Sequence, residues 1–338
     1  MIHNKVLILF DLLFFVLISG SIFFYSFSFI DPLIKSKWYW TIFAFMLLIF
    51  VIVSVYLINP QISINYTIGV KNIFFIISFL CVLQALYGWG QWFGLCKSYG
   101  NFPVCGSFDN PSGFSACLTM GYSFVLYFIQ EENVYKRITM MISLIIVIGA
   151  VLISGSRTGI IAIILVSILW VAGGYKKLRL RYKRAIIIIV CFVIIQLFIF
   201  LYLLRIESAD GRILIWINTW CMFKDNPLVG LGRGAFTAKY MLYQADYFKN
   251  NPNSCFSQLA DNVNHPFNEY LLILVEYGLI GIFILFLGII FLFYYYNNNK
   301  NKESFVALMS LVSIGISSCF SYPFRYPFTW IILIVGCV

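Results

Sequence analysis

Charged residues are scarce in this sequence of 338 amino acids. Only 11% of the chain is Asp, Glu, Lys or Arg, whereas 62% is hydrophobic. A soluble globular domain carries about 25% charged residues, and an aqueous surface needs more polar cover than this chain can supply. The composition therefore excludes an ordinary soluble protein.

Alternation of polar and apolar residues, the signature of a membrane-spanning strand, is also lacking. The apolar residues form long runs instead, each near the roughly 20 residues with which a helix crosses a bilayer. Because backbone polar groups must satisfy one another in hydrocarbon, these runs predict helices. We expect an all-α, polytopic integral membrane protein with about ten transmembrane helices. The expected spans are 6–30, 38–58, 71–94, 113–130, 138–154, 158–174, 185–204, 267–296, 304–322 and 326–338.

Patterns for metal binding and internal repeats are absent as well. No CxxC or Cys/His spacing typical of zinc occurs, and the acids of the loops are scattered, so we expect neither a metal nor a cofactor. No repeat supports an inverted-repeat transporter. Cys96 and Cys105 share one polar loop, and we predict a disulfide between them, with two free thiols as the alternative.

Acids are outnumbered by bases, 13 against 23, which gives a net charge of +10. The bases lie in short connectors, where they set membrane topology, so we expect no nucleic-acid partner. Segment 175–184 holds six Lys and Arg and no acid, which predicts a cytoplasmic loop. Lys35 and Lys37, which this orientation places outside, disagree with it.

The same orientation places a large loop, residues 205–266, on the non-cytoplasmic side. It separates the N-terminal transmembrane helices of 1–204 from the C-terminal ones of 267–338, and we expect one membrane domain overall. A connection of this length is uncommon and is usually functional.

Arg157 is the first candidate for chemistry. It lies in SGSRTG, residues 154–159, between two apolar runs. An arginine at a membrane boundary needs a partner, and a guanidinium matches a phosphate through two parallel hydrogen bonds. Arg157 is therefore a candidate phosphate ligand, and a hairpin tip whose arginine reaches lipid headgroups is the structural alternative.

The second candidate is a helix expected within 208–236. Arg212, Trp216 and Trp220 recur every four residues and share one helical face, and Asp210 suits the N-cap. Tryptophans favour a helix at the membrane interface, so an interfacial anchor is the alternative to a ligand site.

A glycine-rich stretch, GLGRG at 230–234, follows this helix. It lacks the Gly-Lys-Ser/Thr ending of a nucleotide-binding loop, so it predicts no nucleotide. It supplies flexible backbone beside a third cation, Arg233.

The third candidate is segment 264–281, NHPFNEYLLILVEYGLIG. Pro266 suits the first position of a helix. From there Asn268, Glu269 and Glu276 fall within one narrow arc, so two carboxylates line one face of a membrane helix. Acids within membrane helices are functional candidates.

His265, one of two histidines in the chain, lies just before this expected helix. Its unperturbed pKa near neutrality suits a general base, whereas a purely structural role is the alternative. Together, three arginines, an imidazole and carboxylates at the outer membrane face favour an anionic lipid substrate that bears a phosphate or diphosphate.

The order of these motifs resembles the bacterial O-antigen ligase and O-antigen polymerase superfamily. The resemblance covers roughly residues 100–338. Its motifs are SGSRTG at 154–159, GRxxxW at 211–216, NPLxGxGxGxF at 226–236, the stretch from His265 through NEYLxxxxExGxxG to Gly281, and GSFDNPSGFSA at 106–116.

The resemblance implies a GT-C-like membrane glycosyltransferase that is inverting and metal-independent. Such an enzyme moves a glycan from undecaprenyl diphosphate to an acceptor hydroxyl, for example on lipid A-core, at the periplasmic face of the bacterial inner membrane. Its partners are the lipid-linked donor, the glycan acceptor and membrane lipids. A polymerase of O-antigen or capsular polysaccharide is the first alternative, and a transporter of lipid-linked glycans is the second.

The resemblance also implies roles for individual residues. Arg157 and Arg212 would bind the diphosphate leaving group. To these we add Arg233 as a third cation for the diphosphate, with Trp216, Asn268 and Glu276 as supporting residues. The catalytic histidine of the family stands directly before the Asn of a His-Asn pair, and Phe267 occupies that position here. His265 is therefore the first candidate for the general base, and Glu269 is the second.

Overall fold

The structure is a computed structural model that describes residues 2–29, 31–58, 69–99, 102–130, 132–174, 206–298 and 300–337. Every regular element within these ranges is a helix, so the all-α prediction is confirmed. The expected span 185–204 and the basic segment 175–184 lie outside the described residues. The helices are α1 (Ile2–Phe23), α2 (Lys35–Ile58), α3 (Val70–Trp92), α4 (Pro111–Phe128), α5 (Val134–Ile153), α6 (Arg157–Gly174), α8 (Ile206–Asp225), α9 (Ala235–Asn250), α10 (Glu269–Asn298), α11 (Lys302–Phe320) and α12 (Pro327–Cys337), with short 3₁₀ turns η1 (Ser257–Leu259) and η2 (Pro323–Arg325).

Five of the described helices are long and apolar enough to cross a membrane, by length and composition. They are Lys35–Leu57, Val70–Trp92, Val134–Ile153, Glu269–Asn298 and Lys302–Phe320. Large apolar side chains such as Phe43, Phe50 and Phe283 are more than half exposed on two of them, as contact with lipid requires. The polytopic membrane class is therefore confirmed, and the total of about ten crossings stays a prediction.

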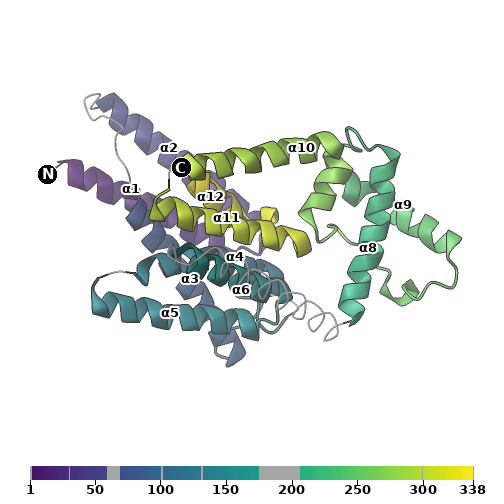
Figure 1. Ribbon diagram of the computed structural model, residues 1–338, viewed down its shortest axis with the longest axis horizontal. Coiled ribbons are helices and arrows are strands. Elements are labelled where there is room, and N and C mark those ends of the chain that lie inside the picture. The colour runs from purple at the N-terminus through teal and green to yellow at the C-terminus, as the bar shows by residue number, and fades with distance from the viewer. Residues whose placement is uncertain are drawn as a thin grey trace, which may run out of the picture. The chain divides into compact units, whose positions relative to one another are not determined.

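The chain divides into two compact units. Unit 1 comprises residues 1–166, 300–317 and 323–338, and unit 2 comprises 167–299 and 318–322. The helices of each unit can be followed in Figure 1.

The centre of unit 1 is α4, which packs against α3 and α5. Its side chains from Gly113 to Phe128 are all buried, as expected of a helix that is apolar on every side. The Asn110 side chain caps the helix by accepting a hydrogen bond from the Gly113 N–H at 2.7 Å. This cap fixes the start of α4 within the GSFDNPSGFSA motif.

Lys37, which disagreed with the predicted topology, is fully buried in unit 1. Its ammonium group donates to the Ser107 carbonyl at 2.7 Å and lies 5.4 Å from the centre of the Phe108 ring. A lysine engaged inside the protein does not report the electrostatics of a membrane surface. Burial therefore accounts for the disagreement of Lys37, whereas Lys35, which is exposed, still disagrees with the predicted topology.

Amine-reactive labelling of the folded protein should modify Lys35 and spare Lys37. The two residues are one helical half-turn apart in α2, yet Lys35 is exposed and Lys37 is not. Mass spectrometry of the labelled protein would read both sites, and labelling after denaturation provides the control in which both should react. Equal reaction in the folded state would contradict the burial of Lys37.

The predicted disulfide between Cys96 and Cys105 is wrong, since both are free thiols. Cys105 is buried with its Sγ 3.1 Å from the Ser98 Oγ, whereas the Cys96 thiol lies against Gly90. The two sulfur atoms therefore contact different groups and are not bonded to each other.

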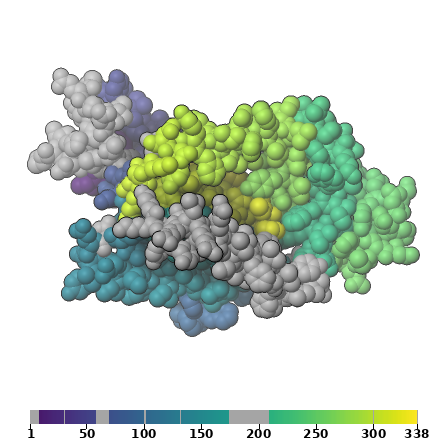
Figure 2. Space-filling model, in the orientation of Figure 1, coloured from purple at the N-terminus to yellow at the C-terminus, as the bar shows by residue number. Residues whose placement is uncertain are grey.

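In unit 2, α8, α9 and α10 enclose a small apolar core made of Ile215, Met222, Phe236, Tyr240 and Val275. The atoms of α9 and of the residues after it are largely exposed at the surface of this unit (Figure 2).

The Tyr243 hydroxyl ties α9 to the end of α8 by donating a hydrogen bond to the Asp225 carboxylate. This bond raises the pKa of Tyr243 to about 12. The hydrogen bond requires a protonated Tyr243 hydroxyl, and at neutral pH the hydroxyl is protonated, so the bond is present.

A loop of unit 2 crosses a break in α10. The helix is interrupted at Gly278, whose backbone is non-helical with φ 65° and ψ −159°. Segment 227–232 lies against the break and forms four backbone hydrogen bonds with it. These bonds run from the N–H of Leu231 to the carbonyl of Val275 (2.7 Å), from Gly232 to Glu276 (3.1 Å), from Leu279 to Pro227 (2.9 Å) and from Ile280 to Leu228 (3.2 Å). The crossing loop thus satisfies the backbone groups that the break leaves without helical partners.

Glycines make this crossing possible. A Cβ on Gly278 would lie 2.3 Å from the Leu228 carbonyl oxygen, and one on Gly230 would lie 2.4 Å from the Glu276 carbonyl carbon. The glycines of the NPLxGxGxGxF and ExGxxG motifs therefore have a shared structural role, in which two backbones approach more closely than any side chain would permit.

Candidate functional site

The candidate site in unit 2 is built around Tyr322, which follows α11. The imidazole of His265 stacks on the Tyr322 ring, with ring centres 5.0 Å apart and planes inclined at 29°. The Phe267 ring packs on the same tyrosine at 5.5 Å. The guanidinium carbon of Arg212 lies 5.5 Å from the centre of the Phe267 ring, a cation–π distance. Two predicted site residues, Arg212 and His265, are thereby brought to one aromatic cluster, which we define as His265, Phe267 and Tyr322.

The turn that carries His265 is held by Trp216. The indole N–H of Trp216 donates to the Pro266 carbonyl at 2.8 Å, and Pro266 is buried. Trp216 lies one helical turn after Arg212 in α8, so the same face of α8 presents the cation and fixes the turn. Trp216 therefore supports the site by positioning the 265–267 backbone.

Phe267 has a strained backbone, with φ 52°, and it is the one non-glycine residue with positive φ in the described part of the chain. A left-handed conformation costs a bulky residue of order 1–3 kcal/mol and persists where its surroundings enforce it. Here the ring is held between Arg212 and Tyr322. This strained residue occupies the position that the resemblance assigns to a catalytic histidine.

The start of α10 differs from the prediction that Pro266 is its first residue. The helix begins at Glu269, and Asn268 is its cap, because the Asn268 side chain accepts from the Leu271 N–H at 3.0 Å. The residues from Pro266 to Asn268 instead form the turn that reaches the aromatic cluster. Glu269 is buried, with 8% of its surface exposed, at the N-terminal end of the helix.

Asp210, the predicted N-cap of the preceding helix, lies inside α8, which begins at Ile206. That prediction was wrong because the helix continues toward its N-terminus beyond the Asp-Gly pair, despite the low helix propensity of both residues.

Glu276 and Arg233 lie at the crossing of α10 by the 227–232 loop. The Glu276 carboxylate accepts a hydrogen bond of 2.7 Å from the N–H of Gly234, the residue before α9. Arg233 is exposed beside it. The described contacts of Glu276 thus join α10 to the start of α9.

Arg157 belongs to unit 1 and is the first residue of α6. α5 ends at Ile153 and α6 begins at Arg157, so residues 154–156 connect two apolar helices and the rest of SGSRTG forms the first turn of α6. The Ser156 hydroxyl accepts from the Gly159 N–H at 3.3 Å and from the Ser115 hydroxyl at 2.6 Å. Arg157 is half-buried at a helix N-terminus, where the helix dipole favours an anion.

Tyr322 could not be predicted as a site residue from the sequence. It lies in the connection after α11, more than fifty residues beyond His265 in sequence, and no spacing rule joins the two. Among the described residues, no three His, Cys, Asp or Glu side chains gather as a metal site requires.

Comparison with known proteins assigns part of the chain to a family. The family model described as O-antigen ligase matches residues 142–286, a segment that contains every residue predicted for the site. No curated protein and no solved structure matches the chain.

Proposed function

We propose that this chain is a glycosyltransferase for lipid-linked glycans, because the family model described as O-antigen ligase matches its residues 142–286. It moves a glycan from undecaprenyl diphosphate to an acceptor hydroxyl, on lipid A-core or a similar glycan, at the periplasmic side of the inner membrane. The proposed transfer is inverting and uses no metal.

The observation that carries the proposal is the joint placement of Arg212 and His265 on one aromatic cluster. Arg212, beside the cluster, is a cation suited to a phosphate group, and His265, within it, carries an imidazole suited to proton transfer. Arg212 lies against the Phe267 ring and His265 against the Tyr322 ring, and preorganised groups of this kind can stabilise a developing charge.

The bond changes of the proposed reaction are those of a displacement at the anomeric carbon. The acceptor oxygen loses its proton to a base and forms the new bond to this carbon. The bond from the carbon to the phosphate oxygen breaks on the opposite face, and its electron pair leaves with the diphosphate. Arg212 stabilises that negative charge, and we assign the same role to Arg157 and, at its exposed position, to Arg233.

His265 is the first candidate for the base. Its Nδ1 is buried, so Nε2 is the atom that would accept the proton. Glu269 is the second candidate, since its carboxylate is buried near the same turn. Trp216 holds the turn that follows His265, and Asn268 caps the helix that begins at Glu269.

Replacing Arg212 with alanine should reduce glycan transfer about 100- to 1,000-fold, because a preorganised group facing the developing charge is lost. Arg212→Lys should retain part of the activity, since it keeps the charge but loses the paired hydrogen bonds. Transfer from the lipid-linked donor would be assayed in membranes with matched expression. Lys239→Ala, which removes an exposed cation of α9, is the control. Wild-type activity in Arg212→Ala would remove this residue from the mechanism.

The glycan profile of a deletion strain tests the function itself. A ligase predicts loss of long glycan from the acceptor together with accumulation of lipid-linked polymer. A polymerase predicts a single repeat left on the acceptor. Loss of long glycan from the acceptor, with the lipid-linked glycan retained on the cytoplasmic side, would contradict both and favour a transporter.

A further inference from the structure

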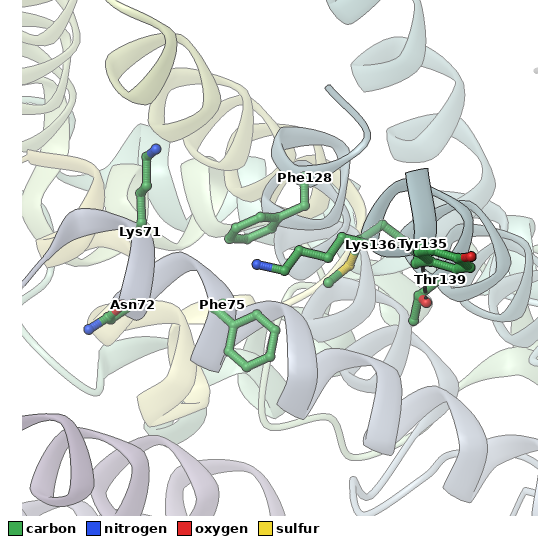
Figure 3. Close-up of a pocket in the computed structure, with 8 residues that line it drawn as sticks. Lys71, Asn72, Phe75, Phe128, Tyr135, Lys136 and Thr139 are labelled. Carbon is green, nitrogen blue, oxygen red and sulfur yellow. Dashed lines mark hydrogen bonds between the residues drawn. The ribbon is translucent and has the colours of Figure 1, made fainter. Parts of the chain in front are cut away.

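We propose that unit 1 carries a binding site for an anionic phospholipid at the first turns of α3 and α5. The site is a cavity of about 730 Å³. Its wall includes Lys71, Phe75, Phe128 and Lys136, which come from α3, α4 and α5 (Figure 3).

The position of the cavity matches the headgroup level of a membrane. Lys71 is the second residue of α3 and Lys136 is the third residue of α5, and both helices are long and apolar enough to cross a bilayer. Their first turns therefore lie where hydrocarbon gives way to headgroups. Tyr135, also in the wall, is 83% exposed, as is typical of an aromatic residue at the membrane interface.

The charge of the cavity favours an anion. Two lysines face it, and none of the lining residues that the structure describes is acidic. Neither lysine forms an ion pair with another described residue. Two acids of the same unit lie near the cavity: Asp11 accepts a hydrogen bond from the lining residue Asn72, and Glu303 accepts one from Tyr127 and also interacts electrostatically with Lys71.

The rest of the wall suits acyl chains. Phe75 lies against Phe128, with ring centres 6.0 Å apart, and stacks along α3 on Phe79. Figure 3 shows Lys136 extended from α5 toward Phe75 and Phe128, so a cation and an apolar surface meet in one cavity. A phospholipid would match both features, with its phosphate between the two lysines and its acyl chains along the phenylalanine rings.

The predicted topology places this end of unit 1 at the cytoplasmic leaflet, whose anionic lipids attract basic residues. The site is lined by unit 1 alone, and its ligand needs no part in the proposed glycan transfer. We therefore assign it to a structural phospholipid that holds α3, α4 and α5 together.

Native mass spectrometry of the purified full-length protein tests the assignment, with phosphatidylglycerol and phosphatidylcholine as probes. The wild type should retain phosphatidylglycerol preferentially. Each lysine should contribute roughly fivefold, so Lys71→Gln/Lys136→Gln should weaken retention of phosphatidylglycerol roughly 25-fold. Lys239→Gln/Lys249→Gln, which removes the same charge from exposed positions of α9, should change it less than twofold, the ordinary scatter for surface substitutions.

A second variant separates the cavity from diffuse charge. Thr139→Trp fills the cavity from α5 and leaves both lysines in place, and it should also release phosphatidylglycerol. Equal retention of the two lipids by the wild type would overturn the proposal. So would unchanged retention in the double lysine variant or in Thr139→Trp, or an equal loss in the α9 control.

Discussion

Replacing His265 with alanine should lower the turnover number for glycan transfer about 100- to 10,000-fold, the range expected when a general base is removed. The donor KM should change far less, because the base acts on the acceptor proton and not on the diphosphate. Steady-state kinetics in membranes with matched expression would separate the two parameters. A rise in KM with unchanged turnover would contradict the assignment.

His265→Asn is the decisive companion variant. Asparagine can form local hydrogen bonds at the turn before α10, but it does not accept a proton near neutral pH. If His265 is the base, His265→Asn should be as impaired as His265→Ala. Full activity of His265→Asn would show that the residue only shapes the turn, and the same kinetic defect would then be expected of Glu269→Gln.

Replacing Gly278 with alanine should prevent the protein from reaching its folded state in good yield. The new Cβ would lie 2.3 Å from the Leu228 carbonyl oxygen, and the backbone conformation at this position is accessible essentially only to glycine. The conformational strain alone costs of order 1–3 kcal/mol, before the loss of hydrogen bonds across the break is added. Yield and thermal midpoint of the purified protein would measure the effect.

Gly288→Ala is the matched control in the same helix. No atom lies within 4 Å of a Cβ at Gly288, so this change should be neutral or should stabilise α10 by up to about 1 kcal/mol. Gly230→Ala, on the crossing loop, should reproduce the defect of Gly278→Ala. Normal folding of Gly278→Ala would contradict the described crossing.

The helical class and the positions of most spans could be predicted because apolar run length alone decides them. The expected spans 71–94 and 138–154 correspond to α3 and α5 to within a few residues. Helix starts were predicted less well, since Asp210 lies inside α8 and Pro266 precedes α10. At Pro266 the ordinary preference for a helix start was outweighed by a tertiary contact, the hydrogen bond from Trp216 to the Pro266 carbonyl.

The candidate site could be predicted only in part. Local spacing was sufficient to bring Arg212 and Trp216 to one face, because a helix repeats every 3.6 residues. It gave no means to find Tyr322, which reaches His265 through the tertiary fold. Nor could it indicate that the break at Gly278 accepts a separate loop, since hydropathy is continuous through residues 269–298.

The crossing of α10 by segment 227–232 has a consequence for how the gene can change in length. Its four hydrogen bonds pair two short backbones in a fixed register, so one inserted or deleted codon between Pro227 and Gly232, or between Val275 and Ile280, would misalign every pair after it. The exposed stretch from Asn250 to Asp261 carries no such register. Insertions and deletions that preserve function should therefore accumulate there, and an epitope tag placed in that stretch should be tolerated.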